Sequence, residues 1–180
     1  NQGIVVVDTE VSPVLAEAIR QRIESEFDDS RIAVVINTHG HGDHTYGNQV
    51  FSDALIVGHE AVRPAMEAAE DRRRTMAARL GLLVENLSTR LDGLPPDEEA
   101  AIALKRKVSY YESVRRGLGD GFQLTFPTIT FSEGVWMDLG DLTLELTWFG
   151  VSHSDSDILV YCPEEGLLLT GDLFAPGVDL

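Results

Sequence analysis

The segment NTHGHGDH, residues 37–44, places three histidines and one aspartate within six positions, in a chain that has five histidines in all. His39 and His41 are two residues apart, so in an extended segment their side chains leave on the same face. Two neutral imidazoles on one face can bind one cation at nitrogen–metal distances of about 2.0–2.1 Å. The adjacent Asp43 and His44 point in different directions and can serve a second cation beside the first. The segment therefore predicts a transition-metal site.

The residues before this segment predict the elements that position it. The β-branched runs 3–8 and 31–38 read as buried strands, and 12–27 between them reads as a helix. Ser12 is the expected N-cap, with Pro13 as the first helical residue. Apolar residues of this helix then recur every four positions, at Leu15, Ile19 and Ile23. Strand, helix and strand in this order predict a sheet covered by helices.

The middle of the chain has a different character. Residues 54–60 read as another strand, but from 61 to 121 Arg, Glu, Ala and Leu dominate, and the loop 92–100 separates two helical stretches. Acidic residues at 97–99 stand where a helix start favours negative charge. We therefore expect one domain over 1–180, with residues 61–121 forming a helical hairpin inserted into a β-rich core.

Strand character returns after this insert. The residues at 138–141, DLGD, read as a tight hairpin turn. We expect Trp136 and Trp148 to belong to the core, and Cys162 to be a buried structural thiol. The predicted strands are FQLTFPTITF (122–131), GVWMDLGDLTLELTWF (134–149), DILVYC (157–162) and GLLLTGD (166–172).

Three segments, in order along the chain, resemble the signatures of the metallo-β-lactamase superfamily. THGHGDHTYGN (38–48) resembles the first motif, FGVSHSDSDILVY (149–161) the second, and GLLLTGDLF (166–174) the third. In this resemblance His153 is the lone histidine of the second motif, and Asp172 takes the position of the bridging carboxylate. The resemblance implies an α/β fold, an αββα sandwich with the metal site at one edge, interrupted by the helical hairpin.

The resemblance also implies a glyoxalase II-like ligand set for two zinc ions. One ion would bind the histidines at 39, 41 and 153, the other would bind Asp43 and His44, and Asp172 would bridge them. The family's final histidine normally follows a further strand and helix, whereas the chain stops at Leu180. We therefore expect that ligand and the last αβ portion to be missing, so that the chain is C-terminally truncated.

Some positions depart from the family pattern. Glu10 replaces the glycine of the usual Asp-Thr-Gly after the first strand. The second motif usually reads His-Thr-Pro-Gly-Ser, but here Asp155 and Asp157 make it acidic. One of these carboxylates could approach the metals, but we expect a solvated turn instead. His59 closes a strand outside the motifs, and we interpret it as a hydrogen-bonded packing residue.

The ligand types narrow the reaction. His41 stands where the family's di-iron oxygen reductases carry Glu, and Asp172 stands where the true β-lactamases carry Cys or Ser. The resemblance then implies a hydrolase in which hydroxide between two zinc ions cleaves an ester, thioester, lactone, sulfate ester or phosphodiester, with Asp43 orienting the nucleophile or accepting a proton. One alternative is a persulfide dioxygenase with a single iron on His39, His153 and Asp172. Another is a metal-containing scaffold without turnover.

The composition bounds the partners. The formal net charge is −16, with 30 acidic and 14 basic residues, and this acidity argues against nucleic acid and anionic membranes as partners. No apolar run approaches the roughly 20 residues that span a bilayer. We expect a small-molecule substrate, and a homodimer through the helical insert is a further possibility. The chain begins without Met, so we expect upstream sequence to have been removed, and the compartment stays open.

Overall fold

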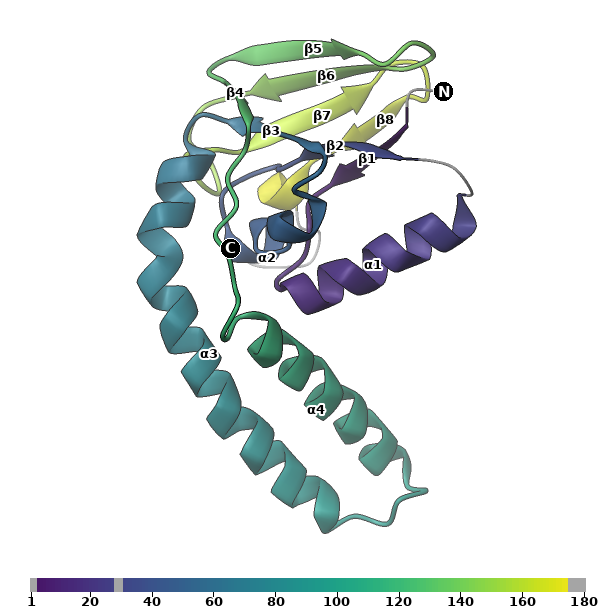
Figure 1. Ribbon diagram of the computed structural model, residues 1–180, viewed down its shortest axis with the longest axis vertical. Coiled ribbons are helices and arrows are strands. Elements are labelled where there is room, and N and C mark those ends of the chain that lie inside the picture. Colours follow the sequence, from purple (N-terminus) through teal and green to yellow (C-terminus); the bar gives the residue numbers. More distant parts are fainter. Residues whose placement is uncertain (1–2, 28–30, 175–180) are drawn as a thin grey trace.

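The computed structural model describes residues 3–27 and 31–174. Two four-stranded sheets face each other (Figure 1), and neighbouring strands of the first sheet are all parallel. The first sheet has the order β1 (Ile4–Val7), β2 (Ile32–Ile36), β3 (Leu55–His59) and β4 (Ile129–Phe131). The second sheet is antiparallel, with the order β5 (Gly134–Asp138), β6 (Thr143–Trp148), β7 (Ile158–Cys162) and β8 (Leu167–Leu169).

The helices follow the expected order. They are α1 (Pro13–Glu26), α2 (Gly42–Thr45), η1 (Asn48–Phe51), α3 (Val62–Asp92), α4 (Glu99–Gly117) and η2 (Gly171–Leu173). Ser12 caps α1 as predicted, because its side chain accepts a hydrogen bond from the Leu15 N–H at 3.5 Å. The predicted apolar stripe is wrong at Ile19, which is 38% exposed, because α1 turns Ala16, together with the predicted Ile23, toward the first sheet.

The main core lies between the two sheets. Alternate residues of each strand face inward, since successive side chains of a strand point to opposite faces. Val34, Ile36 and Val57 of the first sheet pack in one cluster with residues of the second, namely Leu144, Leu146, Ile158, Val160 and Cys162. On the other face of the first sheet, α1 and η1 bury a second cluster that includes Val35, Ile56 and Phe51.

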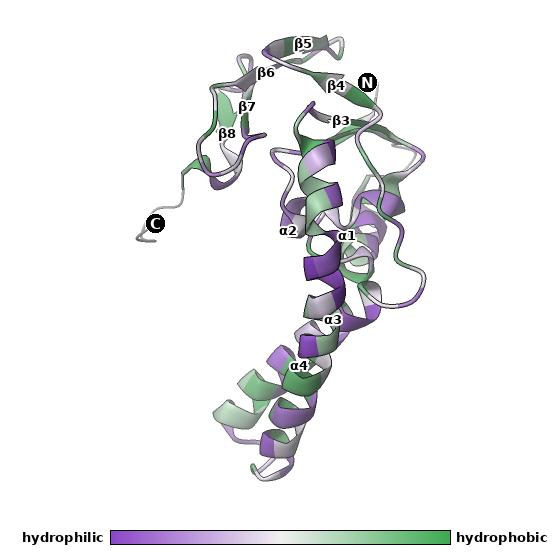
Figure 2. Cartoon of the chain, turned by 90° about the vertical axis from the view of Figure 1, so that its left-hand side faces the viewer, coloured by the Kyte–Doolittle hydropathy of each residue, from purple (hydrophilic) through white to green (hydrophobic). Residues whose placement is uncertain are grey.

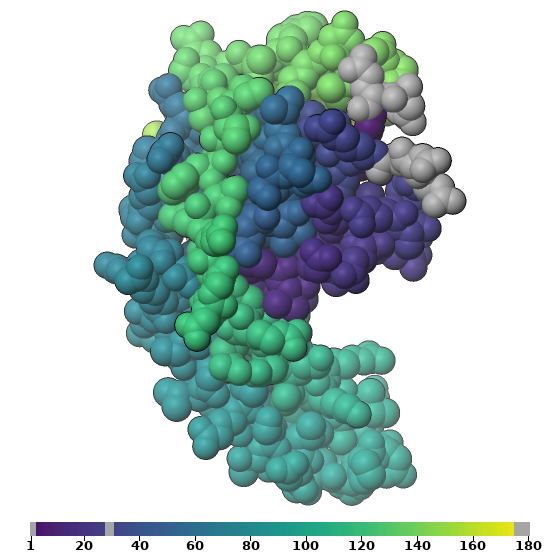
Figure 3. All heavy atoms as spheres, viewed as in Figure 1, coloured from purple at the N-terminus to yellow at the C-terminus, as the bar shows by residue number. Residues whose placement is uncertain are grey.

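Two predictions about the β-rich part are wrong. Trp136 is 72% exposed because the alternation of β5 turns it outward, whereas Val135 and Met137 pack on the core. In the stretch 122–131, only Ile129–Phe131 pairs within a sheet. The preceding residues run along the surface as the green segment of Figure 3. Phe122 in this segment packs against the Tyr46 ring and the Arg73 guanidinium.

α3 and α4 lie side by side and extend away from the sheets as an arm (Figure 2). Leu87 of α3 and Ala101 and Leu104 of α4 are buried, whereas Leu82 is 71% exposed. Figure 2 shows hydrophilic and hydrophobic residues mixed along the helices of the arm. None of the helices in residues 3–27 and 31–174 combines the length and apolar composition needed to cross a bilayer.

Glu10 has a backbone conformation that favours glycine, with φ +75°. A left-handed residue with a Cβ costs about 1–2 kcal/mol, so Glu10→Gly should relieve strain in the loop after β1. The greater freedom of glycine in the unfolded chain offsets part of this gain. We expect Glu10→Gly to raise the free energy of unfolding by about 0.5–1 kcal/mol, measured by urea denaturation. Glu10→Gln keeps the Cβ and should leave stability unchanged. A loss of stability in Glu10→Gly would contradict the proposed backbone strain at Glu10.

Candidate metal centre

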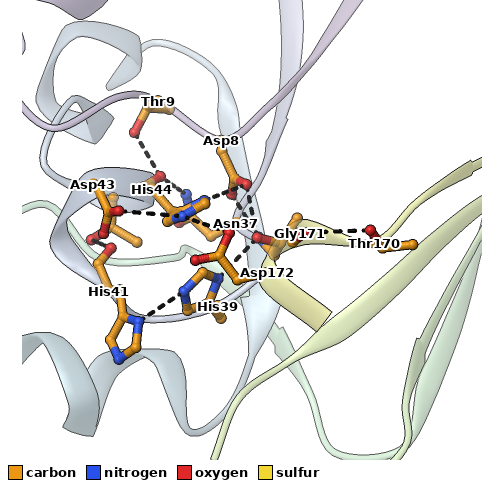
Figure 4. Close-up of polar contacts among 12 residues, drawn as sticks. Asp8, Thr9, Asn37, His39, His41, Asp43, His44, Thr170, Gly171 and Asp172 are labelled. Atoms are coloured by element: carbon orange, nitrogen blue, oxygen red, sulfur yellow. Dashed lines mark hydrogen bonds and ion pairs between the residues drawn. The ribbon is translucent and has the colours of Figure 1, made fainter. Parts of the chain in front are cut away.

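The site lies where strands of both sheets end. β1 and β2 are parallel, so Asp8 and Thr38, which follow them, come to the same edge. The Thr38 carbonyl accepts a hydrogen bond from the N–H of Ile158, at the start of β7, at 2.9 Å. This bond brings the second sheet to the same edge. In Figure 4, the side chains of His39 and His44, which follow β2, and the side chain of Asp172, in the short η2 helix, point toward one another.

Three of the predicted ligands form one cluster. His41 Nδ1 lies 3.0 Å from His39 Nε2 and 3.0 Å from His153 Nε2. These histidines are one of two groups of described residues whose donor atoms all lie within 4.8 Å of one another. Two nitrogens bound to zinc in a tetrahedral arrangement are about 3.3 Å apart, close to this spacing. The donor set and its convergence therefore fit a transition-metal ion.

The second group contains His39, His44 and Asp172. The Asp172 carboxylate lies between the two halves of the site: Oδ1 is 3.4 Å from His44 Nε2, and Oδ2 is 3.5 Å from His153 Nε2. Asp43 belongs to neither group, but its Oδ2 lies 3.7 Å from His44 Nε2 and its side chain is 63% exposed. All six predicted ligands thus meet at one edge, with Asp43 at the rim.

The two central histidines differ in electrostatics. Burial lowers the pKa of His39 to about 4, with smaller electrostatic contributions from the neighbouring His44 and His41, so the ring is neutral at pH 7. Burial also acts to lower the pKa of His44, but the hydrogen bond to Asp8 and the charges of Asp8, Asp43 and Asp172 raise it to about 9. In the metal-free protein His44 is therefore cationic at neutral pH.

Asp8 is a site residue that the sequence reasoning missed. Its Oδ1 accepts a hydrogen bond from the Thr38 N–H at 2.8 Å, and its Oδ2 accepts one from the Thr38 hydroxyl at 2.8 Å. The same Oδ2 lies 2.8 Å from His44 Nδ1, which directs His44 Nε2 toward Asp172. The sequence contains a signal for Asp8, because it stands at the end of one predicted strand, just as His39 follows the next. These two strands pair in parallel, so their ends meet.

Three residues outside the cluster were also the subject of predictions. Asp155 is exposed as expected, but the solvated position predicted for Asp157 is wrong. Asp157 is 2% exposed, and its Oδ2 accepts a hydrogen bond from the Ser154 N–H, because β7 starts in the core. His59 packs as interpreted: its Nε2 donates to the Ser132 carbonyl at 2.9 Å, and its ring stacks on Trp148 at 4.8 Å.

The Asp8–His44 contact predicts a pH-dependent stability of the metal-free chain. The His44 pKa is raised above its unfolded value, so its stabilisation is fully present below about pH 6.5 and is lost as pH rises through about 9. At pH 6, Asp8→Asn should lower the free energy of unfolding by about 2 kcal/mol, because the ion pair with His44 is lost. At pH 10 His44 is neutral, so this contribution should be much smaller. Melting curves of chelator-treated protein from pH 6 to 10 measure this. A difference between the two proteins that does not change with pH would refute the linkage.

Two packed sheets with a histidine–aspartate cluster at their shared edge define an α/β sandwich protein with a candidate metal site. The chain belongs to the metallo-beta-lactamase superfamily, whose family model matches residues 2–180. This confirms the predicted family and fold class. A search of curated proteins finds no relative that matches this chain.

Solved structures share this fold. A metallo-beta-lactamase family protein from Thermus thermophilus has a TM-score of 0.61 and 20% identity, over 98% of this chain and 53% of that one. A metallo-beta-lactamase from Pontibacter korlensis has a TM-score of 0.57 and 18% identity, over 93% and 54%. A double mutant of the sec-alkyl sulfatase PisA1 has a TM-score of 0.59 and 16% identity, over 95% and 27%. The chain thus spans about half or less of the length of these structures.

Proposed function

We propose that the chain carries the metal-binding part of a hydrolase that uses two zinc ions to cleave an ester, thioester, lactone, sulfate ester or phosphodiester bond. The observation that carries this proposal is the convergence of two donor groups that share His39, with Asp172 placed between them. Membership in a superfamily whose members are mostly hydrolases supports the same class of reaction.

The proposed ligands divide into two sets. His39, His41 and His153 would hold one ion, and Asp43 and His44 would hold the other. Asp172 would contact both ions, because its two oxygens face different halves of the site. Zinc bound in this way lowers the pKa of water from about 16 to about 7 and so supplies a nucleophile at neutral pH.

The protein side chains have separate tasks in this proposal. The Asp8 carboxylate fixes the ring of His44 through Nδ1 and leaves Nε2 free to bind. The low pKa of His39 keeps its ring neutral, as a ligand must be. Asp43 is exposed at the rim, where it can orient the attacking water or accept its proton.

The helical insert, residues 61–121, is proposed to form part of the surface that meets substrate or a second copy. Leu82 on α3 is 71% exposed, and a second copy of the arm could cover it. Sedimentation of the purified chain tests this dimer, because a monomer at high concentration would exclude it.

Metal content tests the proposed function. We expect about two zinc ions per chain by elemental mass spectrometry, together with turnover in a screen of thioesters, lactones, sulfate esters and phosphodiesters. One iron per chain with oxygen consumption would replace the hydrolase by the persulfide dioxygenase alternative. No bound metal after loading with zinc or iron would leave only a scaffold without turnover.

A further inference from the structure

Gly40, the residue between His39 and His41, is tied to a distant part of the chain. Its N–H donates a hydrogen bond to Ser156 Oγ at 2.9 Å, and both residues are buried. Ser156 is 0% exposed and lies on the turn that carries His153. One hydrogen bond between residues 116 positions apart therefore joins the two loops that supply the three-histidine cluster.

Gly40 also packs closely against the start of α3. A Cβ on Gly40 would lie 2.6 Å from the Ala65 Cβ and 3.1 Å from the Val62 carbonyl oxygen. The peptide between His39 and His41 therefore has little free space toward α3, and its Gly40 N–H is bonded to Ser156. It cannot move toward α3 to compensate for a change on the side of Ser156.

The turn that carries Ser156 is itself fixed by hydrogen bonds. The Ser156 N–H donates to Ser154 Oγ at 3.1 Å, and the Ser154 N–H donates to the buried carboxylate of Asp157. The next residue, Ile158, donates its N–H to the Thr38 carbonyl. These bonds involve no metal ligand side chain, so the position of the Ser156 hydroxyl is set by the turn and the start of β7.

We propose that Ser156 is a positioning residue that sets the separation between the His39–His41 pair and His153. It does so in the metal-free protein, so the three ring nitrogens converge before an ion arrives. Its hydroxyl supplies the acceptor for the buried Gly40 N–H, which a residue without a side-chain oxygen could not do. This inference rests on the proposed metal site and adds to it a hydroxyl that organises the ligands.

The expected size of the effect follows from known outer contacts of metal ligands. Removing such a contact typically weakens metal binding by roughly 10–100-fold. Ser156→Ala also leaves the buried Gly40 N–H without its acceptor, which destabilises that loop. Both consequences fall on the peptide that joins two of the three histidines, and neither removes a ligand.

The test compares wild-type protein with Ser156→Ala in two measurements. We expect the affinity for Co²⁺, followed by its visible absorption in competition with a chelator, to fall by about 10–100-fold. In the metal-free protein we expect the Gly40 amide hydrogen to exchange on the order of tenfold faster or more, because its acceptor is lost.

Thr128→Ala is the matched control. The Thr128 hydroxyl also accepts a backbone N–H from a distant residue, that of Ile56 at 3.1 Å, but it joins β3 to the segment before β4. We expect this variant to keep the wild-type Co²⁺ affinity. An equal fall in affinity in Thr128→Ala would show a general loss of stability and overturn the positioning role.

The remaining outcomes separate the two proposals. Wild-type Co²⁺ affinity in Ser156→Ala, with rapid Gly40 exchange, would overturn the positioning role and leave the metal site intact. Failure of the wild-type protein to bind Co²⁺ or Zn²⁺ would overturn the proposed function and, with it, the positioning role. Weaker Co²⁺ binding together with faster Gly40 exchange in Ser156→Ala would support the positioning role and the metal site on which it rests.

Discussion

Asp172→Asn is expected to lower bound zinc by about one ion per chain and to reduce turnover by on the order of a thousandfold. The carboxylate faces both halves of the site, with one oxygen 3.4 Å from His44 Nε2 and the other 3.5 Å from His153 Nε2. Asparagine keeps the size of the side chain but removes its negative charge and one ligand oxygen. Removing one electrostatic partner of a reacting centre typically costs about 10²–10³-fold in rate, and loss of an ion adds to this.

Elemental mass spectrometry and turnover of the best substrate measure these effects. Asp155→Asn is the matched control, since it makes the same chemical change in an exposed residue two positions after His153. We expect Asp155→Asn to keep wild-type zinc content and rate. Asp172 is partly exposed, so the melting temperature of the metal-free variant should stay close to that of the wild type. Unchanged zinc content and turnover in Asp172→Asn would contradict the proposed bridging role of Asp172.

Gly47→Ala is expected to lower the free energy of unfolding by about 3 kcal/mol or more. A Cβ on Gly47 would lie 1.8 Å from the Thr9 carbonyl oxygen and 2.5 Å from the Ala16 Cβ. The backbone of Gly47 is right-handed, with φ −82°, so the effect comes from lack of space. Overpacking costs about 1–3 kcal/mol where side chains can yield, and here a backbone carbonyl would have to move. The moving segment follows β1 and carries Asp8, so the candidate site would be displaced as well.

Urea denaturation checks this effect, with Gly81→Ala as its counterpart. Gly81 lies within α3, and the nearest atom to an added Cβ is the Arg115 Cδ at 3.7 Å, an ordinary contact. Alanine there should stabilise the chain by about 0.5–1 kcal/mol, because glycine is a poor helix residue. The two Gly→Ala changes should therefore have opposite signs. A loss of less than about 1 kcal/mol in Gly47→Ala would mean that the loop after β1 packs less tightly than described.

The family, the fold class and the gathering of the site residues could be predicted from the sequence alone. His39, His153 and Asp172 each follow a run of strand-forming residues, and strand ends are where a sandwich brings loops together. The spacing of His39 and His41 is local, so it needed no tertiary information. The cap of α1 at Ser12 was predictable for the same reason, since its donor lies three residues away.

The errors have a common physical origin. Trp136 lies on the outward face of β5, and the period of a strand alone does not say which face will be covered. Ala16 is buried in the core whereas Ile19 is not, because the orientation of α1 against the sheet decides which side of the helix is buried. In the stretch 122–128, apolar residues pack against α3 and Tyr46 without joining a sheet.

Residue types, their order and their positions at strand ends were enough to locate a candidate metal site, because ligand chemistry is a property of the side chains themselves. The packing of the two sheets decided which other residues support that site. Asp8 reaches His44 across 36 positions, and Ser156 reaches Gly40 across 116. Such contacts exist only after β1 pairs with β2 and the start of β7 meets Thr38. A local sequence pattern cannot predict partners that are so distant in the chain. Only the tertiary structure therefore shows how the candidate ligands are held.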